Sequence, residues 1–310
     1  MKLALALLFL ANLDGLETID RCQPNGRGSC VQTILTRPRG TAAKLPAVML
    51  VPWLSCDGVD FGAGPLDGMN ELSRRIATRS GFVYLRVDKP KPCADADFQT
   101  ELAGYRAAFE SLRAHAWVDP DRIILIGMSN GGGILPLVSN GRPVAGYVVV
   151  NGWSSTWFEH MLDHLRRSQE TNGAVAKRMQ ELAELYADYL LEKKLPRDVI
   201  AAKPYLAALW EGDQTRQYGR PAAFFHQLQE LNLAEAWSRV KEPTLAVWGE
   251  ADVIMSRADH QRIVDLVNRN TPDAARLIVV PKMDHFVERD GRFPDEVFTS
   301  IDEWMKRVAK

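Results

Sequence analysis

Residues 122–138 of this chain read R-I-I-L-I-G-M-S-N-G-G-G-I-L-P-L-V. The β-branched and aliphatic residues at 123–126 predict a buried strand, and the apolar segment after the three glycines predicts a helix. Between them, Gly127 and Gly131 flank Ser129 in a G-x-S-x-G arrangement. Small residues at these two positions allow a strained turn to lift the serine hydroxyl above the edge of a sheet. The stretch therefore predicts a strand–turn–helix unit with Ser129 as a candidate nucleophile.

Apolar runs and helical periodicity alternate on both sides of this unit. Polarity alternates at residues 30–36, as expected of a half-buried strand. Continuous apolar runs, which are typical of parallel strands covered on both faces, occupy residues 46–51, 82–87, 144–150, 243–248 and 276–280. Amphipathic helices are expected at residues 68–79, 98–112 and 257–270, and from Pro294 onward. The alternation predicts an α/β fold with a mostly parallel central sheet flanked by helices.

The alternation stops between residues 153 and 240. This segment contains no strand-like run of useful length, and its apolar residues, rich in Trp, Tyr and Phe, fall at helical spacing. We expect a helical insertion at 153–240 in an α/β core formed by residues 1–152 and 241–310. A chain of 310 residues buries roughly three quarters of its unfolded surface, which is ample for one large domain with such an insertion.

Composition and charge narrow the choice of partner. The chain has 38 Lys and Arg residues against 39 Asp and Glu residues, which gives a net charge of -1. This balance offers no basic footprint for nucleic acid and no polybasic membrane patch, so we expect a small-molecule partner. His160 and His164 have the spacing of a two-histidine metal site, but H-M-L-D-H lacks the glutamate that zinc peptidases use as a base. We therefore interpret both histidines as polar-face residues and expect neither metal nor cofactor.

The N-terminus and the cysteines leave the cellular compartment open. Residues 1–13 have one lysine and an apolar run too short to span a bilayer, as in a signal peptide, but they lack a small-x-small cleavage site. Export and a cytoplasmic location both remain open. Cys56 and Cys93 each follow a predicted strand and could face one another, while Cys22 and Cys30 lie close in sequence. No C-x-x-C spacing occurs, and disulfides and free thiols both remain open.

Three polar residues follow the ends of three predicted strands. Ser129 follows the strand at 123–126, Asp252 lies in W-G-E-A-D after another strand, and His285 lies in P-K-M-D-H-F after a third. The carboxyl ends of parallel strands meet at one edge of a sheet, so these side chains are expected to converge. Glu250 and Asp284 are rivals of Asp252, but the first lies too early in its loop and the second should point away from the adjacent histidine.

The order Ser, Asp, His in the motifs G-M-S-N-G, W-G-E-A-D and M-D-H-F resembles the α/β-hydrolase superfamily. The resemblance extends from about Cys30 onward and is strongest to bacterial esterase and serine-aminopeptidase-like members with a helical cap. It implies an α/β-hydrolase fold and a catalytic triad in which Ser129 attacks a carbonyl carbon. His285 would take and return the proton, and Asp252 would hold the imidazole.

The same resemblance implies two backbone donors for the oxyanion of the intermediate. One is the N–H of Asn130, directly after the nucleophile, and the other is Leu54, with Ser55 as the next choice. The chain departs from the family here, because it has Pro-Trp where relatives commonly have His-Gly. Trp53 and Trp153, each close behind a strand, are expected to line the substrate pocket.

The expected activity is hydrolysis of a carboxylic ester through an acyl-enzyme. An apolar, aromatic cap favours an acyl or aromatic group of small to moderate size. One alternative is a serine peptidase of the aminopeptidase or dipeptidyl-peptidase type on the same triad, in which a carboxylate such as Glu159 captures an amino terminus. Another is a binding protein that keeps the fold without activity. The oligomeric state stays open.

Overall fold

The computed structural model describes residues 15–61, 66–169, 175–210 and 212–310, so the signal-peptide hypothesis for residues 1–13 lies outside it. Its main sheet has eight strands in the order β1-β2-β4-β3-β5-β6-β9-β10. The central strands β4, β3, β5, β6, β9 and β10 are parallel, while β2 pairs antiparallel with both β1 and β4. The predicted α/β fold is thereby confirmed.

The sheet strands follow the predicted apolar runs with small differences in their ends. Their bounds are β1 Leu16–Pro24, β2 Cys30–Pro38, β3 Leu45–Val51, β4 Val83–Pro90, β5 Val118–Met128, β6 Gly146–Val150, β9 Thr244–Gly249 and β10 Ala275–Val280. Alternate residues of the inner strands point to opposite faces, so each strand contributes to two separate apolar cores. A continuous apolar run is what burial on both faces requires.

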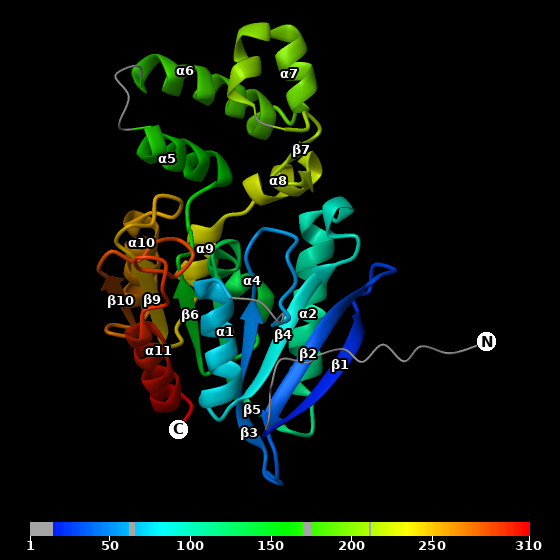
Figure 1. The fold of residues 1–310 in the computed structure, drawn as a ribbon, viewed down its shortest axis with the longest axis vertical. Helices are drawn as coiled ribbons and strands as arrows, with labels where there is room; N and C mark the ends of the chain where they lie inside the picture. Colours follow the sequence, from blue (N-terminus) through cyan, green and yellow to red (C-terminus); the bar gives the residue numbers. More distant parts are fainter. Residues whose placement is uncertain (1–14, 62–65, 170–174, 211) are drawn as a thin grey trace, which may run out of the picture.

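Helices cover both faces of the sheet (Figure 1). On one face lie α1 (Gly68–Arg79) and α11 (Asp295–Val308), and on the other lie α2 (Phe98–Arg113) and α10 (Arg257–Asn270). Asp97 caps α2, because its carboxylate accepts a hydrogen bond from the backbone N–H of Thr100 at 2.7 Å. No helix of the described residues is long and apolar enough to cross a membrane.

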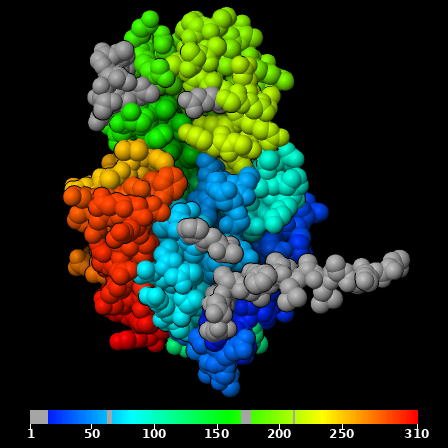
Figure 2. Space-filling model, in the orientation of Figure 1, coloured from blue at the N-terminus to red at the C-terminus, as the bar shows by residue number. Residues whose placement is uncertain are grey.

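Between β6 and β9 the chain leaves the sheet and forms a group of mostly helical elements. They are α5 Trp157–Gln169, α6 Val175–Tyr186, the π-helix η2 Ala187–Leu191, α7 Pro196–Ala202, the 3-10 helix η3 Pro204–Leu209, β7 Arg216–Gln217, β8 Arg220–Pro221, α8 Ala222–Gln229 and α9 Leu233–Ser238. Figure 2 shows the elements from α5 to α8 as a lobe on one end of the molecule. The helix α9 returns toward the sheet and packs against α10.

Three strands, β1, β7 and β8, differ from the sequence predictions. The strand β1 was not predicted, because most of its side chains are exposed and polar and its pattern of apolar residues is weak. It forms a hairpin with β2 that the Cys22–Cys30 disulfide closes, with a Cα–Cα distance of 5.5 Å. The inserted segment also contains the hairpin β7–β8, whose strands of two residues are too short to produce a periodic signal.

Candidate active site

The turn after β5 places Ser129 in a strained backbone conformation. Its φ of 54° and ψ of -124° lie outside the regions that a residue with a Cβ prefers. The two flanking glycines make this turn sterically feasible. A Cβ on Gly127 would lie 2.5 Å from the carbonyl oxygen of Gly131, and a Cβ on Gly131 would collide with the carbonyls of Val51 and Pro52. The turn is tied to β6 by a hydrogen bond of 3.0 Å from the Ser129 N–H to the carbonyl of Val150.

The three residues that follow three different strands lie within hydrogen-bond distance of one another. The Nε2 atom of His285 is 3.0 Å from the Oγ of Ser129, and its Nδ1 atom is 3.0 Å from Oδ2 of Asp252. Because a carboxylate only accepts, Nδ1 donates to Asp252, which leaves Nε2 as an acceptor for the serine hydroxyl. All three residues are buried. The arrangement can therefore move a proton from Ser129 to His285.

Local backbone groups fix the carboxylate of Asp252. Its Oδ1 accepts hydrogen bonds from the backbone N–H groups of Ile254 and Met255, both at 2.8 Å, while Oδ2 faces His285. The carbonyl of Asp252 accepts a further hydrogen bond of 3.1 Å from the guanidinium of Arg167 on α5. One carboxylate oxygen thus orients the side chain, and the other is left for the imidazole.

The two rival carboxylates have other partners. Glu250 accepts a hydrogen bond of 3.2 Å from the backbone N–H of Lys282. Asp284 accepts from the backbone N–H groups of Phe286 and Glu288 at 3.0 and 2.9 Å, so it shapes the turn that follows β10. Of the three carboxylates, Asp252 is the one paired with His285.

Sequence reasoning missed Asn151, which directly follows β6. Its Nδ2 atom donates to the carbonyls of Asp284 and His285, both at 3.0 Å, and its Oδ1 accepts from the N–H of Gly249 at 3.0 Å. The residue has a positive φ of 45° and is fully buried. It fastens the histidine loop to the neighbouring strand ends. The rule used for Ser129, that polar residues after parallel strands meet at one edge, applies equally to Asn151.

A cavity of about 310 Å³ opens above Ser129 and His285. Its wall combines residues of the sheet edge with residues of the inserted segment: Trp53, Leu54, Ser55, Asp57, Asp67, Met69, Asn130, Trp157, His160, His164, Tyr218, Ile254, Met255 and Phe286. Trp53 lines the cavity. Trp153 does not: it is fully buried behind the wall, where its indole N–H donates to the carbonyl of Asn130 at 3.1 Å. Its ring packs in a T-shaped contact against Trp157, which lines the cavity instead.

The sequence predicted His160 and His164 on the polar face of a helix, but in the structure His160 is buried and His164 is half-buried. Both line the cavity, and their rings stack with a centroid distance of 6.2 Å. Burial lowers the pKa of His160 below its usual range, so this imidazole is neutral near neutral pH. The Nδ1 atom of His164 donates to the carbonyl of Val253 at 3.0 Å. Within the described part of the chain, no group of three or more potential ligands is placed to hold a metal ion.

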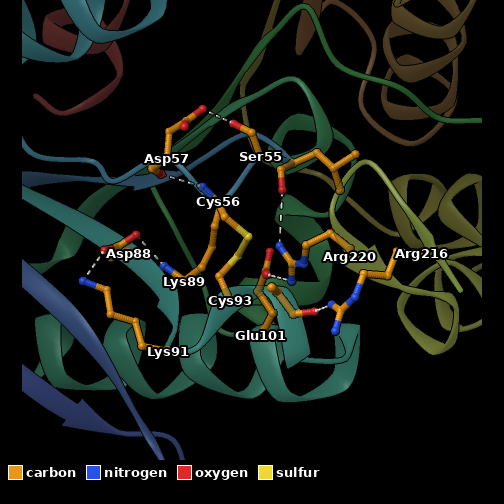
Figure 3. Close-up of a disulfide and its surroundings, with 12 residues drawn as sticks. Ser55, Cys56, Asp57, Asp88, Lys89, Lys91, Cys93, Glu101, Arg216 and Arg220 are labelled. Atoms are coloured by element: carbon orange, nitrogen blue, oxygen red, sulfur yellow. Dashed lines mark hydrogen bonds and ion pairs between the residues drawn. A yellow bond between two sulfur atoms is a disulfide. The ribbon is translucent and has the colours of Figure 1, made fainter. Parts of the chain in front are cut away.

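The loop after β3 carries the predicted second oxyanion donor, and several long-range contacts hold it (Figure 3). A disulfide joins Cys56 to Cys93 with a Cα–Cα distance of 5.7 Å, so both cysteine pairs that the sequence left open form disulfides. The carbonyl of Asp57 accepts a hydrogen bond from Nζ of Lys89 at 3.3 Å. Leu54 and Ser55 line the cavity together with Ser129 and Asn130.

The sequence matches the alpha/beta hydrolase family over residues 44–299, and the chain belongs to this family. Among similar proteins, the esterase EstD of Thermotoga maritima is 21% identical over 287 residues, which cover 87% of this chain and 64% of EstD. The chain thus spans less than two thirds of the length of that curated relative.

Two solved esterases resemble this chain in fold. Est1E from Butyrivibrio proteoclasticus has a TM-score of 0.60 at 14% identity, and the match covers 95% of this chain and 98% of Est1E. Carboxyl esterase 2 from the fungus Tuber melanosporum has a TM-score of 0.58 at 16% identity, covering 96% of this chain and 89% of that one. At such low identity the similarity concerns the fold.

Proposed function

We propose that this protein is a serine esterase that cleaves carboxylic esters through an acyl-enzyme. The observation that carries the proposal is the chain of two hydrogen bonds, Ser129 to His285 to Asp252, at the floor of a cavity. Membership of the alpha/beta hydrolase family and the similarity to EstD support an ester as the substrate.

In the proposed reaction the Ser129 Oγ attacks the carbonyl carbon of the ester while His285 accepts its proton at Nε2. Asp252 stabilises the imidazolium that forms and keeps the ring oriented. His285 then donates the proton to the departing alcohol, which leaves an acyl group on Ser129. Water, deprotonated by the same histidine, releases the acid and restores the free serine. No cofactor takes part in this scheme.

The tetrahedral intermediates require two hydrogen-bond donors for their oxyanion. We assign one to the backbone N–H of Asn130 and the other to the loop after β3, at Leu54 or Ser55. All three residues lie in the wall of the cavity beside the nucleophile, which supports this assignment. Removing one such donor costs about 3–4 kcal/mol of transition-state stabilisation in other serine hydrolases.

We further propose that residues 153–240 serve as a cap that shapes the substrate site. Trp157, His160 and Tyr218 of this segment line the cavity opposite the sheet edge. A volume of about 310 Å³ lies at the lower end of the range for ligand pockets and suits an acyl or aromatic group of modest size. Est1E has been solved with ferulic acid bound, which makes aromatic acyl esters a sensible part of any substrate panel.

In the peptidase alternative, Glu159 would capture the amino terminus of the substrate, but its carboxylate has another partner. Glu159 accepts hydrogen bonds from the backbone N–H and the hydroxyl of Thr156, both at 2.9 Å, and so caps its own helix. It is not among the residues of the described chain that line the cavity. An amino-terminal substrate therefore has no support from Glu159.

A panel of nitrophenyl esters compared with aminoacyl and dipeptidyl anilides tests the proposal. We expect turnover of the esters and covalent labelling of the folded protein by a fluorophosphonate. The variant Ser129→Ala should lose both, with an unchanged circular dichroism spectrum. Cleavage of anilides without esters would establish a peptidase, and a folded wild-type protein that resists labelling would indicate a binding protein.

A further inference from the structure

Arg220 is a fully buried arginine of the inserted segment that reaches into the core. Its Nη2 atom pairs with a carboxylate oxygen of Glu101 on α2, and its guanidinium lies 4.0 Å from the centre of the Phe224 ring. Its Nη1 atom donates a hydrogen bond of 3.2 Å to the backbone carbonyl of Leu54. One side chain thus connects the insertion, α2 and the loop that follows β3 (Figure 3).

The buried ion pair holds the guanidinium in a fixed place. Glu101 is fully buried and accepts a second hydrogen bond, of 2.9 Å, from the hydroxyl of Tyr105. A buried ion pair rarely stabilises a fold more than apolar residues of the same size would, because both charges lose their hydration. The presence of Arg220 is therefore better explained by its other contact, the hydrogen bond from Nη1 to the carbonyl of Leu54.

Holding the Leu54 carbonyl fixes the orientation of a whole peptide group. The peptide group between Leu54 and Ser55 contains the carbonyl of Leu54 and the N–H of Ser55. It is planar, and in the trans form this N–H points opposite to the carbonyl. Leu54 and Ser55 line the cavity, whereas Arg220 does not. With the carbonyl turned to Arg220, the peptide cannot rotate to present its oxygen to the cavity. Such a rotation would place an acceptor where a developing oxyanion needs a donor.

Two further anchors lie along the same loop. Lys89 holds the carbonyl of Asp57 at 3.3 Å, and the disulfide to Cys93 holds Cys56. In Figure 3, Lys89, Cys93 and Arg220 lie on one side of the segment from Ser55 to Asp57. Of these three anchors, Arg220 belongs to the inserted segment, and it acts at the peptide beside the proposed donor.

We propose that Arg220 is a positioning residue for the oxyanion site, through which the inserted helices control the geometry of the loop at Leu54 and Ser55. This inference rests on the proposed esterase function and assigns that function a residue outside the triad. Glu101 acts with Arg220, because it holds the guanidinium in reach of the Leu54 carbonyl.

The variant Arg220→Lys tests the inference. A lysine keeps the charge opposite Glu101 but has no planar fork, so it cannot bind the carboxylate and the carbonyl in the same geometry. We expect kcat for a nitrophenyl ester to fall about 10- to 100-fold, the size of effect that a misplaced group near the reacting atoms produces. KM should stay within about threefold of wild type, because substrate binding in the cavity is not altered.

Inhibition by an alkyl trifluoromethyl ketone separates positioning from a general loss of structure. Its carbonyl carbon bonds to the Ser129 Oγ, the hydroxyl proton passes to His285, and the carbonyl oxygen becomes an oxyanion. The inhibition constant of Arg220→Lys should therefore rise by the same factor by which kcat/KM falls. An unchanged inhibition constant and kcat, even with a lower melting temperature, would show that Arg220 is only structural and would overturn the inference.

Arg216→Lys is the matched control. Arg216 lies in the same hairpin and also binds the segment before α2, at the carbonyl of Ala94 and the carboxylate of Asp95, but it is partly exposed and its described contacts do not include Leu54. We expect wild-type kinetics from this variant. The double variant Arg220→Met/Glu101→Gln removes both charges of the buried ion pair together, and it should show the same loss of kcat as Arg220→Lys. Wild-type kcat in this folded double variant would also contradict the inference.

The test distinguishes this inference from the proposed function. If the wild-type protein neither turns over esters nor reacts with a fluorophosphonate, the proposed function is wrong, and the inference falls with it. If the wild type is active and Arg220→Lys matches Arg216→Lys in kcat and ketone inhibition, the inference alone is wrong.

Discussion

The two halves of the candidate site are held in place in different ways. Ser129, Asp252 and His285 follow the ends of β5, β9 and β10, and short backbone contacts orient them, such as those from Ile254 and Met255 to Asp252. The loop after β3 is instead held by side chains from distant parts of the chain. Its partners are Arg220 of the insertion, Lys89 of β4 and Cys93 beyond it.

This difference decides what a mutation can do to each half. In the half formed by Ser129, Asp252 and His285, the strand order and the tight turns set the geometry. A single substitution there mainly removes a chemical group and leaves the backbone in place. The loop side has no regular structure to support it at residues 52–61, and its shape depends on contacts that single substitutions can release. Substitutions on the two sides should therefore differ in their effect on turnover.

The largest effect is expected from Asp252→Asn. An amide at this position can donate to Nδ1 of His285 and so favour the tautomer in which Nε2 carries the proton and cannot act as base. We expect kcat for a nitrophenyl ester to fall about 10⁴-fold, as for the corresponding change in other serine hydrolases. Steady-state kinetics at neutral pH would measure this.

Glu250→Gln is the matched control for that change. Glu250 lies in the same loop but binds the backbone of Lys282, so its amide variant should keep wild-type turnover. If Glu250→Gln lost as much activity as Asp252→Asn, the assignment of the orienting carboxylate would be wrong.

A smaller effect is expected from Asn151→Gly. Glycine accepts the positive φ at this position, so the variant removes the side chain without adding strain. The histidine loop then loses two hydrogen bonds and the buried N–H of Gly249 loses its acceptor. We expect kcat to fall about 10-fold and the free energy of unfolding to drop by about 1–3 kcal/mol.

Asn140→Gly is the control for Asn151→Gly, and urea denaturation with steady-state kinetics measures both. Asn140 also has a positive φ, of 50°, but it is exposed at the end of a helix and far from His285 in the fold. Its variant should keep full turnover. Equal turnover in the two variants would mean that the histidine loop holds its position without Asn151.

Much of the fold could be predicted from the sequence, because strands buried on both faces require continuous apolar runs. Ser129, Asp252 and His285 could be identified as candidates for a related reason: parallel strands end at one edge of the sheet, and each of these polar residues follows such a strand. The strand β1 was not predicted, because an exposed edge strand does not require alternating apolar residues.

The contacts of the oxyanion loop could not be predicted in the same way. No local pattern links Arg220 to Leu54, which lie 166 positions apart, and no spacing shows which tryptophan faces a cavity. Trp153 and Trp157 are both buried in the structure, and the difference between them depends on how α5 packs above the sheet. Such contacts follow from tertiary packing, which the sequence encodes only over long distances.

The double variant Cys56→Ser/Cys93→Ser tests the loop side of the contrast. The bond closes a segment with a sequence separation of 37, and losing such a link typically costs about 2–4 kcal/mol of stability. We also expect kcat to fall by about threefold to tenfold, because the loop at Leu54 and Ser55 gains freedom. Thermal unfolding and ester kinetics measure the two effects.

The second disulfide provides the control for that variant. Cys22→Ser/Cys30→Ser removes the bond that closes the β1–β2 hairpin, which lies at the edge of the sheet away from the cavity. It should lower stability without changing kcat. A loss of kcat in this variant equal to that of the Cys56–Cys93 variant would show that turnover reports general stability and not loop position.

The smallest effect on turnover is expected at Lys89, where the predicted change is in the free energy of unfolding. Burial lowers the pKa of Lys89 to about 8 from its usual 10.5, against the opposing effects of Glu101, Asp88 and Asp57. Between these pH values the unfolded chain binds the proton and the folded chain does not. The free energy of unfolding should therefore rise with pH in this window, by up to about 1.4 kcal/mol per pH unit from this group. The same contribution is lost as the pH falls to 8.

Urea denaturation of the wild type and of Lys89→Met between pH 8 and 10.5 isolates this contribution, because methionine has no proton to release. The difference in unfolding free energy between the two proteins should change with pH in that window. Lys91→Met is the control for replacing a nearby lysine by methionine, since Lys91 is exposed and pairs with Asp88. If the difference in unfolding free energy between wild type and Lys89→Met did not change with pH, Lys89 would keep its charge in the folded protein. The anchor at Asp57 would then be a full ion–dipole contact throughout the pH range, and the loop would be held more firmly than the burial of this lysine implies.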